Sequence, residues 1–109
     1  MARILITGSS GSLGSRLTEK LAAEGHTCYG FDIAENSEFD LTNKKKFYDF
    51  VAVVKPAIII HLAATIYGVA GFNENDGDIL MRDMMATQNV VSAWQDFPVD
   101  HLVYTSSSM

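Results

Sequence analysis

Three glycines at positions 8, 11 and 14 have the spacing of a turn that binds a phosphate group. They follow a short β-branched and aliphatic run and open a segment with helical periodicity. Gly8 permits a sharp exit from a strand, Gly11 lets a pyrophosphate approach the backbone, and Gly14 lets a helix and a strand pack closely. The free amides of Ser12 and Leu13 at the start of the helix then point at the anion.

Asp32 adds a second feature of a dinucleotide site. It ends the second predicted strand 32 − 14 = 18 residues after Gly14, close to the spacing of a carboxylate that hydrogen-bonds a ribose. Such a carboxylate repels a 2′-phosphate and no arginine follows it, so the sequence favours NAD over NADP. Ser10, inside the turn, joins the predicted cofactor contacts. The alternative is a glycine-rich turn that holds no ligand.

The elements that must position these residues alternate along the chain. Apolar positions at helical spacing predict a helix from Ser12, a second helix capped by Asn43 and a long helix over residues 79–95. Short apolar runs predict strands over residues 3–7, 27–31, 57–62 and 101–105. This alternation implies an α/β fold, a doubly wound parallel sheet of the Rossmann type covered by helices on both sides. We predict the strand order 3-2-1-4, with the ligand at the carboxyl ends of the first and fourth strands.

Composition narrows the class of protein. The chain has 109 residues, 48% hydrophobic and 19% charged, which predicts one globular domain over residues 1–109. Its net charge of −5 argues against nucleic acid and anionic membranes as partners, because both need a basic patch. The single cysteine, Cys28, excludes an internal disulfide, and no Cys/His spacing predicts a metal site. We see no signal peptide and no membrane span, and expect a cytoplasmic protein.

Taken together, the motifs resemble those of the extended short-chain dehydrogenase/reductases of the NAD-dependent epimerase/dehydratase type. The resemblance covers the whole chain and rests on segments in the family's order and spacing: TGSSGSLG at 7–14, FD at 31–32, DLT at 40–42, KPAIIIHLAA at 55–64, TQNVV at 87–91 and LVYTSSS at 102–108. It implies the N-terminal, NAD-binding part of an enzyme that acts on a nucleotide sugar. Such an epimerase, dehydratase or reductase transfers a hydride at a sugar carbon.

The resemblance also implies individual cofactor contacts. Asp40, with Leu41 beside it, would hydrogen-bond the adenine amine, and the alternative is a loop acid before a helix. The end of the third predicted strand would line the cofactor with Leu62, Ala63 and Ala64.

For catalysis, the resemblance implies that Ser107 hydrogen-bonds the substrate oxygen while a tyrosine transfers the proton. Ser106 or Ser108 takes this role if the register shifts by one, and a solvated serine-rich end is the alternative. His61 is interpreted as a structural residue at a strand end rather than as a base. Asp83 stands where the family usually carries asparagine, and it is kept as a cofactor-binding candidate although a carboxylate cannot donate as an amide does.

Part of the family's machinery is not found in this sequence. None of the four tyrosines has a lysine four residues later, so we expect the family's Tyr-x-x-x-Lys pair and substrate region beyond position 109. The 109-residue chain alone is then expected to be inactive, and the resemblance implies a homodimer for the intact enzyme. The alternative is a non-catalytic module that binds dinucleotides or senses their redox state.

Four large side chains on the last predicted helix are interpreted as core packing rather than a partner surface. They are Met81, Met84, Met85 and Trp94.

Overall fold

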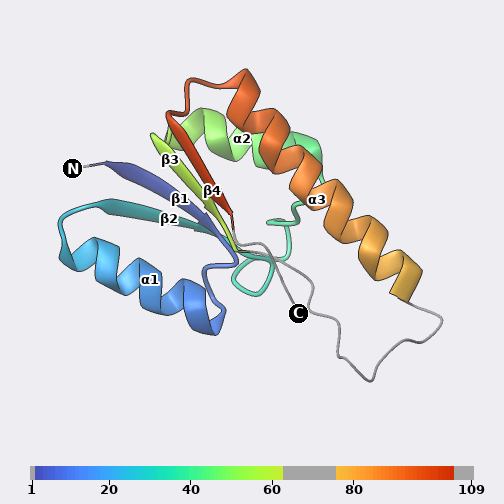
Figure 1. Ribbon diagram of the computed structural model, residues 1–109, viewed down its shortest axis with the longest axis horizontal. Coiled ribbons are helices and arrows are strands. Elements are labelled where there is room, and N and C mark those ends of the chain that lie inside the picture. Colours follow the sequence, from blue (N-terminus) through green and yellow to red (C-terminus); the bar gives the residue numbers. More distant parts are fainter. Residues whose placement is uncertain (1, 63–75, 105–109) are drawn as a thin grey trace.

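Four parallel strands form one sheet in the computed structural model (Figure 1). The structure describes residues 2–62 and 76–104, with the backbone alone for residues 76–80 and 83. The strands are β1 (Arg3–Thr7), β2 (Thr27–Phe31), β3 (Ile58–His61) and β4 (His101–Tyr104), and the helices are α1 (Ser12–Ala23), α2 (Lys44–Val54) and α3 (Asp76–Asp96). Strands and helices alternate as predicted, which confirms the α/β class with a parallel sheet.

The order of the strands differs from the predicted one. The sheet runs β2-β1-β3-β4, so β3 pairs with β1 and β4 pairs with β3. Residues 32–43, between β2 and α2, form turns and contain no strand that extends the sheet beyond β2. The connection through α2 instead carries the chain across β1 to its other side. The predicted order 3-2-1-4 is therefore wrong.

The apolar content of β1 and β3 fits their central places in this order. β1 contains Ile4-Leu5-Ile6 and β3 contains Ile58-Ile59-Ile60, and runs of this kind suit strands that are covered on both faces. These two strands occupy the middle of the sheet, where Leu5 and Ile59 are fully buried. The direction of chain progression reverses between them. The ligand crevice expected of such a sheet lies at the carboxyl ends of β1 and β3, not of β1 and β4 as predicted.

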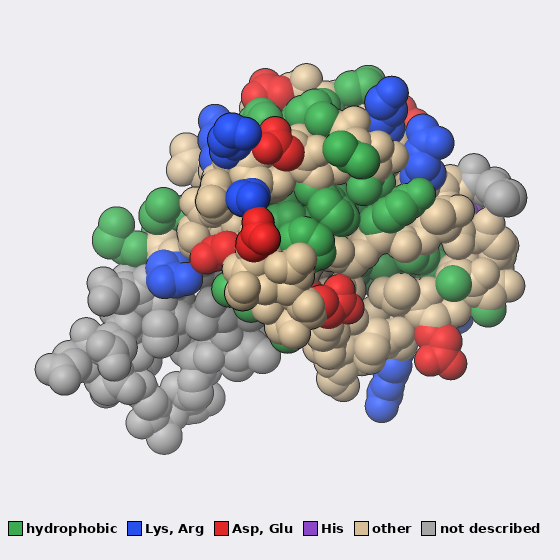
Figure 2. All heavy atoms as spheres, turned by 180° about the vertical axis from the view of Figure 1, so that it is seen from behind, with side chains coloured by type: hydrophobic (Ala, Val, Ile, Leu, Met, Phe, Trp, Pro, Cys, Tyr) green, Lys and Arg blue, Asp and Glu red, His purple; other side chains and the backbone are tan. Residues whose placement is uncertain are grey.

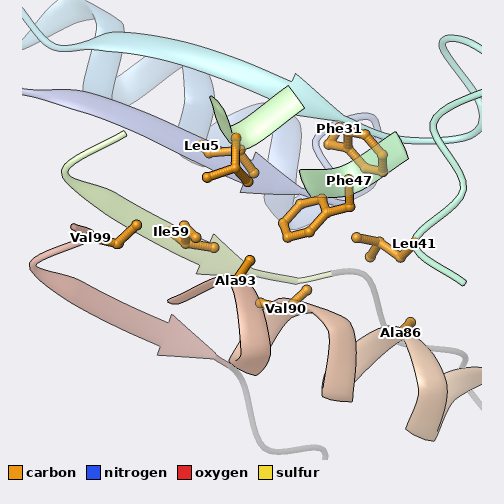
Figure 3. Close-up of a cluster of buried hydrophobic side chains, with 10 residues drawn as sticks. Leu5, Phe31, Leu41, Phe47, Ile59, Ala86, Val90, Ala93 and Val99 are labelled. Atoms are coloured by element: carbon orange, nitrogen blue, oxygen red, sulfur yellow. The ribbon is translucent and has the colours of Figure 1, made fainter. Parts of the chain in front are cut away.

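The helices lie on opposite faces of the sheet. α1 lies against β1 and β2 on one face, whereas α2 and α3 lie together on the other (Figure 1). The main hydrophobic core forms beneath α2 and α3 (Figure 3), and Phe31 is its aromatic centre, with the ring centroids of Phe39 and Phe47 at 4.8 and 5.1 Å. The buried residues of this core are Leu5, Phe31, Leu41, Phe47, Val51, Ile59, Ala86, Val90, Ala93 and Val99. This packing fixes the carboxyl end of β2, immediately before Asp32.

Local hydrogen bonds fix the ends of the first two helices. After α1, Gly25 has a φ of 97° and its amide donates to the Ala22 carbonyl, while the His26 amide donates to the Leu21 carbonyl, which is a Schellman closure. Asn43 caps α2 as predicted, and its side-chain oxygen accepts from the Lys46 amide at 3.2 Å.

The methionines of α3 do not pack in the core. Met81, Met84 and Met85 are 63, 61 and 46% exposed, so their interpretation as core residues is wrong for the part of the chain that the structure describes. The reason is the position of these residues around the helix. α3 packs into the core through Ala86, Val90 and Ala93, and the methionines lie on the opposite side of the helix. Trp94, by contrast, is half-buried and packs against the core as predicted.

The surface carries both signs of charge. On the face seen in Figure 2, acidic and basic side chains are interspersed with hydrophobic ones, and the basic groups do not merge into one area. No helix among the described residues is long and apolar enough to cross a bilayer. The described residues also contain no group of three or more His, Cys, Asp or Glu side chains placed to hold a metal ion.

Candidate cofactor site

The glycine-rich turn follows β1, and backbone hydrogen bonds connect it to β2 and within itself. Gly8 has a φ of 72°, a conformation that side chains rarely adopt, and its amide donates to the Phe31 carbonyl of β2 at 3.1 Å. The Gly11 amide donates back to the Gly8 carbonyl at 3.1 Å. The turn is therefore fixed to the ends of both β1 and β2.

The two later glycines of the turn have different surroundings. A Cβ at Gly14 would overlap the Gly8 carbonyl oxygen and lie 2.9 Å from the Cα of Ser9, so α1 approaches the turn more closely than any side chain allows. A Cβ at Gly11 would meet only the Gly8 carbonyl oxygen within 4 Å, at an ordinary contact distance of 3.4 Å. The space on that side of Gly11 is otherwise open, as the approach of a ligand requires.

The N-terminus of α1 suits an anion. Gly11 is the N-cap residue and supplies no side-chain hydrogen bond, and the first turn of the helix holds no acidic residue. The amides of Ser12, Leu13 and Gly14 precede the first full helical turn and have no acceptor within the helix itself. Together with the helix dipole they place partial positive charge beside the open side of Gly11.

Asp32 connects the turn to the end of β2. One carboxylate oxygen accepts from the Ser10 amide and the other from the Ala34 amide, both at 2.9 Å. A carboxylate offers about four lone-pair sites, so two amides leave capacity for further hydroxyl donors. These two hydrogen bonds hold the carboxylate next to the glycine-rich turn, where the sequence predicts a ribose contact.

Sequence reasoning missed a contact between the turn and β2. Ser9 is 6% exposed, and its hydroxyl has no hydrogen-bond partner among the described residues. A Cβ at Gly30 would overlap this hydroxyl, so the glycine makes room for it. The available signal was the glycine inside a strand, since such a glycine often marks a close approach of another chain segment.

Asp40 is engaged by its own loop. Its Oδ1 accepts from the Thr42 amide at 2.9 Å and from the Thr42 hydroxyl at 2.8 Å, and Arg82 Nη2 of α3 lies 3.6 Å from Oδ2. The hydrogen bond from the Thr42 backbone amide is the main reason why the pKa of this carboxyl lies below its ordinary value. Partial burial raises the pKa and so acts against this effect. The neighbouring Leu41 packs its side chain into the core (Figure 3).

The structure brings only part of the predicted site together. The glycine turn follows β1, Asp32 follows β2 and Leu62 follows β3, and the carboxyl ends of these three strands are adjacent in the sheet. Ala63, Ala64 and Ser107 lie outside the described residues, and Asp83 lies in α3 with its backbone alone described.

The model of the NAD-dependent epimerase/dehydratase family matches residues 4–109. The chain belongs to this family. Among curated proteins it is similar to the putative GDP-L-fucose synthase 2 of Arabidopsis thaliana, with 29% identity over 98% of this chain and 32% of that protein. The chain thus spans about a third of the length of that curated relative.

Solved structures share the fold of this family member. DdhaC has a TM-score of 0.85 and 29% identity over 98% of this chain and 30% of its own. WbmG of Bordetella bronchiseptica in complex with NAD has a TM-score of 0.79 and 24% identity over 94% of this chain and 36% of its own. A GDP-L-fucose synthetase of Naegleria fowleri bound to NADP has a TM-score of 0.75 and 21% identity over 94% of this chain and 32% of its own. At these lower identities the likeness shows the fold alone. The family is described as NAD-dependent.

Alanine substitutions at Gly14 and Gly11 are expected to differ in their effect on stability, because only Gly14 is closely packed. Gly14→Ala should lower the free energy of unfolding by about 1–3 kcal/mol, because the added methyl group overlaps backbone atoms that cannot move independently. Gly11→Ala is the matched control and should change it by less than about 0.5 kcal/mol, since the φ of −70° suits alanine and the space is open. Urea unfolding measures both, and equal losses would contradict the close approach at Gly14.

Asp40 is expected to make stability depend on pH. Because its pKa is lower in the folded chain than in the unfolded one, the folded chain binds fewer protons, and stability falls as the pH drops through the folded value. Asp40→Asn imitates the protonated side chain, so wild type should exceed it in free energy of unfolding near pH 7, with the difference shrinking below about pH 3.9. Urea unfolding across this range measures the difference. A difference that is independent of pH would contradict the Thr42 bonds as the cause.

Proposed function

We propose that the chain binds NAD over the carboxyl ends of β1 and β3, with the pyrophosphate at the N-terminus of α1. The observation that carries this proposal is the turn itself, where Gly14 packs on Gly8 while the side of Gly11 next to the uncapped helix start is open. The residues present fit a dinucleotide, since amides of Ser12 and Leu13 suit the phosphates and the fixed carboxylate of Asp32 suits the ribose hydroxyls.

The proposed cofactor contacts beyond the turn follow the family pattern. Asp40 is proposed to receive the adenine amine at its lone pairs not used by Thr42, and Leu41 to contribute beside it through its backbone, because its side chain is buried. Leu62 and the small residues Ala63 and Ala64 after it are proposed to line the other side.

We further propose that this chain is the N-terminal part of a longer enzyme that acts on a nucleotide sugar. Bound NAD would accept a hydride from a sugar carbon, and Ser107 would hydrogen-bond the oxygen on that carbon. The length of the curated relative supports this, since the chain covers 32% of it. A tyrosine and lysine outside these 109 residues would manage the hydroxyl proton, so the chain alone is proposed to bind NAD without turnover.

The intact mass of the protein made from the native gene tests the longer enzyme. We expect a mass about three times the 11.9 kDa of this chain, given the 32% coverage, followed by hydride transfer to NAD in the presence of a nucleotide sugar. A native mass of 11.9 kDa would contradict the proposal and favour a non-catalytic dinucleotide-binding module.

NAD titration of the Gly11→Ala chain tests the pyrophosphate site. The methyl group would occupy the open space above the helix start, so the Kd for NAD should rise by about tenfold or more while the protein stays folded. Isothermal titration calorimetry measures the Kd, with Ala22→Gly at the exposed far end of α1 as a control that should leave it unchanged. An unchanged Kd in Gly11→Ala would place the phosphates elsewhere.

Asp32 is proposed to select NAD over NADP. Asp32→Asn keeps an oxygen that can accept one amide but removes the negative charge that repels a 2′-phosphate, so the ratio of the Kd for NADP to that for NAD should fall by about tenfold. Asp49→Asn, an exposed acid of α2 paired with Lys45, is the matched control and should leave the ratio unchanged. Unchanged affinities for both cofactors in Asp32→Asn would remove this assignment.

A further inference from the structure

A buried histidine connects three elements at the edge of the proposed crevice. His61, the last residue of β3, is 6% exposed. Its Nδ1 lies 2.7 Å from the hydroxyl oxygen of Thr7, the last residue of β1, and its Nε2 lies 3.2 Å from the hydroxyl oxygen of Thr87 in α3. The imidazole thus bridges the two central strands and the helix that covers them.

The Thr7 hydroxyl in turn fixes the chain that leaves β3. The Leu62 amide donates to the Thr7 hydroxyl oxygen at 3.0 Å and to the Thr7 carbonyl oxygen at 3.2 Å. Thr7 is completely buried and directly precedes Gly8. The Thr7 hydroxyl therefore links His61 to the Leu62 amide on one side of the crevice, and Thr7 itself is directly followed by the glycine turn on the other side.

The choice of histidine at this position favours a role beyond filling space. Ile58, Ile59 and Ile60 precede it, and a further apolar residue would extend that run without burying polar atoms. A buried imidazole has a free-energy cost unless its nitrogens are satisfied, but with partners on both sides it gives a fixed geometry that apolar contacts do not give.

The position of this network relates it to one half of the cofactor. Asp32 at the end of β2 marks the side of the adenosine ribose, and the phosphates lie at the turn after β1, so the rest of a dinucleotide extends toward the end of β3. We propose that His61 is a positioning residue for this second, nicotinamide-bearing half, acting through the Thr7 hydroxyl on the Leu62 amide. This inference rests on the proposed NAD site.

Two substitutions of His61 separate its nitrogens. The amide group of His61→Asn occupies the place of Nδ1 and can keep the bond to Thr7, whereas that of His61→Gln reaches the place of Nε2 and can keep the bond to Thr87. His61→Gln should raise the Kd for NAD by about tenfold and leave the Kd for AMP, which carries only the adenosine half, within about twofold. His61→Asn should keep the Kd for NAD within about threefold of wild type.

The measurements are calorimetric titration with NAD and with AMP, the melting temperature, and hydrogen exchange at the Leu62 amide. Faster exchange at Leu62 in His61→Gln than in His61→Asn supports the route through Thr7. Two results would overturn the inference in favour of a purely structural histidine. One is equal weakening of NAD binding by both variants, and the other is a parallel loss of AMP and NAD binding that follows the melting temperature. If one variant fails to fold, Thr87→Val, which removes only the Nε2 contact, should bind NAD as wild type does, and weakened binding overturns the inference.

The failure of the NAD site itself has a different signature. In that case wild type binds neither NAD nor AMP, which overturns the inference and the proposed function together. If only the inference fails, wild type still binds NAD, and the His61 or Thr87 variants give one of the overturning results named above.

Discussion

The close approach between the start of α1 and the carbonyl oxygen of Gly8 is the constraint on which the rest of the site depends. It brings the helix axis so near to the end of β1 that Gly14 has no room for a methyl group. The same approach presses Ser9 against β2, where Gly30 provides the space, and places the Ser10 amide within hydrogen-bond distance of Asp32. One helix position therefore determines both the amides that suit phosphate and the carboxylate that suits ribose.

Short-range features of the site were predictable because they depend on neighbouring residues. The strand before the turn, the helix after it, the cap at Asn43 and the position of Asp32 at the end of β2 all follow from local spacing and turn chemistry. The fold class followed from the alternation of elements. The family resemblance was confirmed by the match over residues 4–109, whereas the roles of individual residues remain predictions.

Features that depend on distant residues were not predictable in this way. The strand order failed because local patterns show that a third strand exists but not on which side of β1 it pairs. The contacts of His61 with Thr7 and Thr87 join residues 54 and 26 positions apart, so no window of the sequence contains them. The exposure of Met84 depends on which face of α3 meets the sheet, and methionine spacing alone does not determine that face.

Electrostatics at the site differ from those of the whole chain. The net charge of −5 would repel an anionic dinucleotide at long range, yet the start of α1 presents amides and no acid. The acid beside the turn, Asp32, accepts hydrogen bonds from two backbone amides. In the proposed site, attraction of the cofactor would depend on oriented backbone groups at short range, and this range would limit the effect of salt on binding.

The strand order also has a consequence for how the chain folds. β1 is synthesised before β2 and β3, yet it pairs on one side with β2 and on the other with β3, where Ile4 lies opposite Ile58. The second pairing closes a loop of more than fifty residues before it gains any contact energy, and such non-local closure slows folding. A ribosome-bound chain that ends before β3 would carry an apolar central strand with one edge unpaired, and an exposed edge of this kind can pair with another chain.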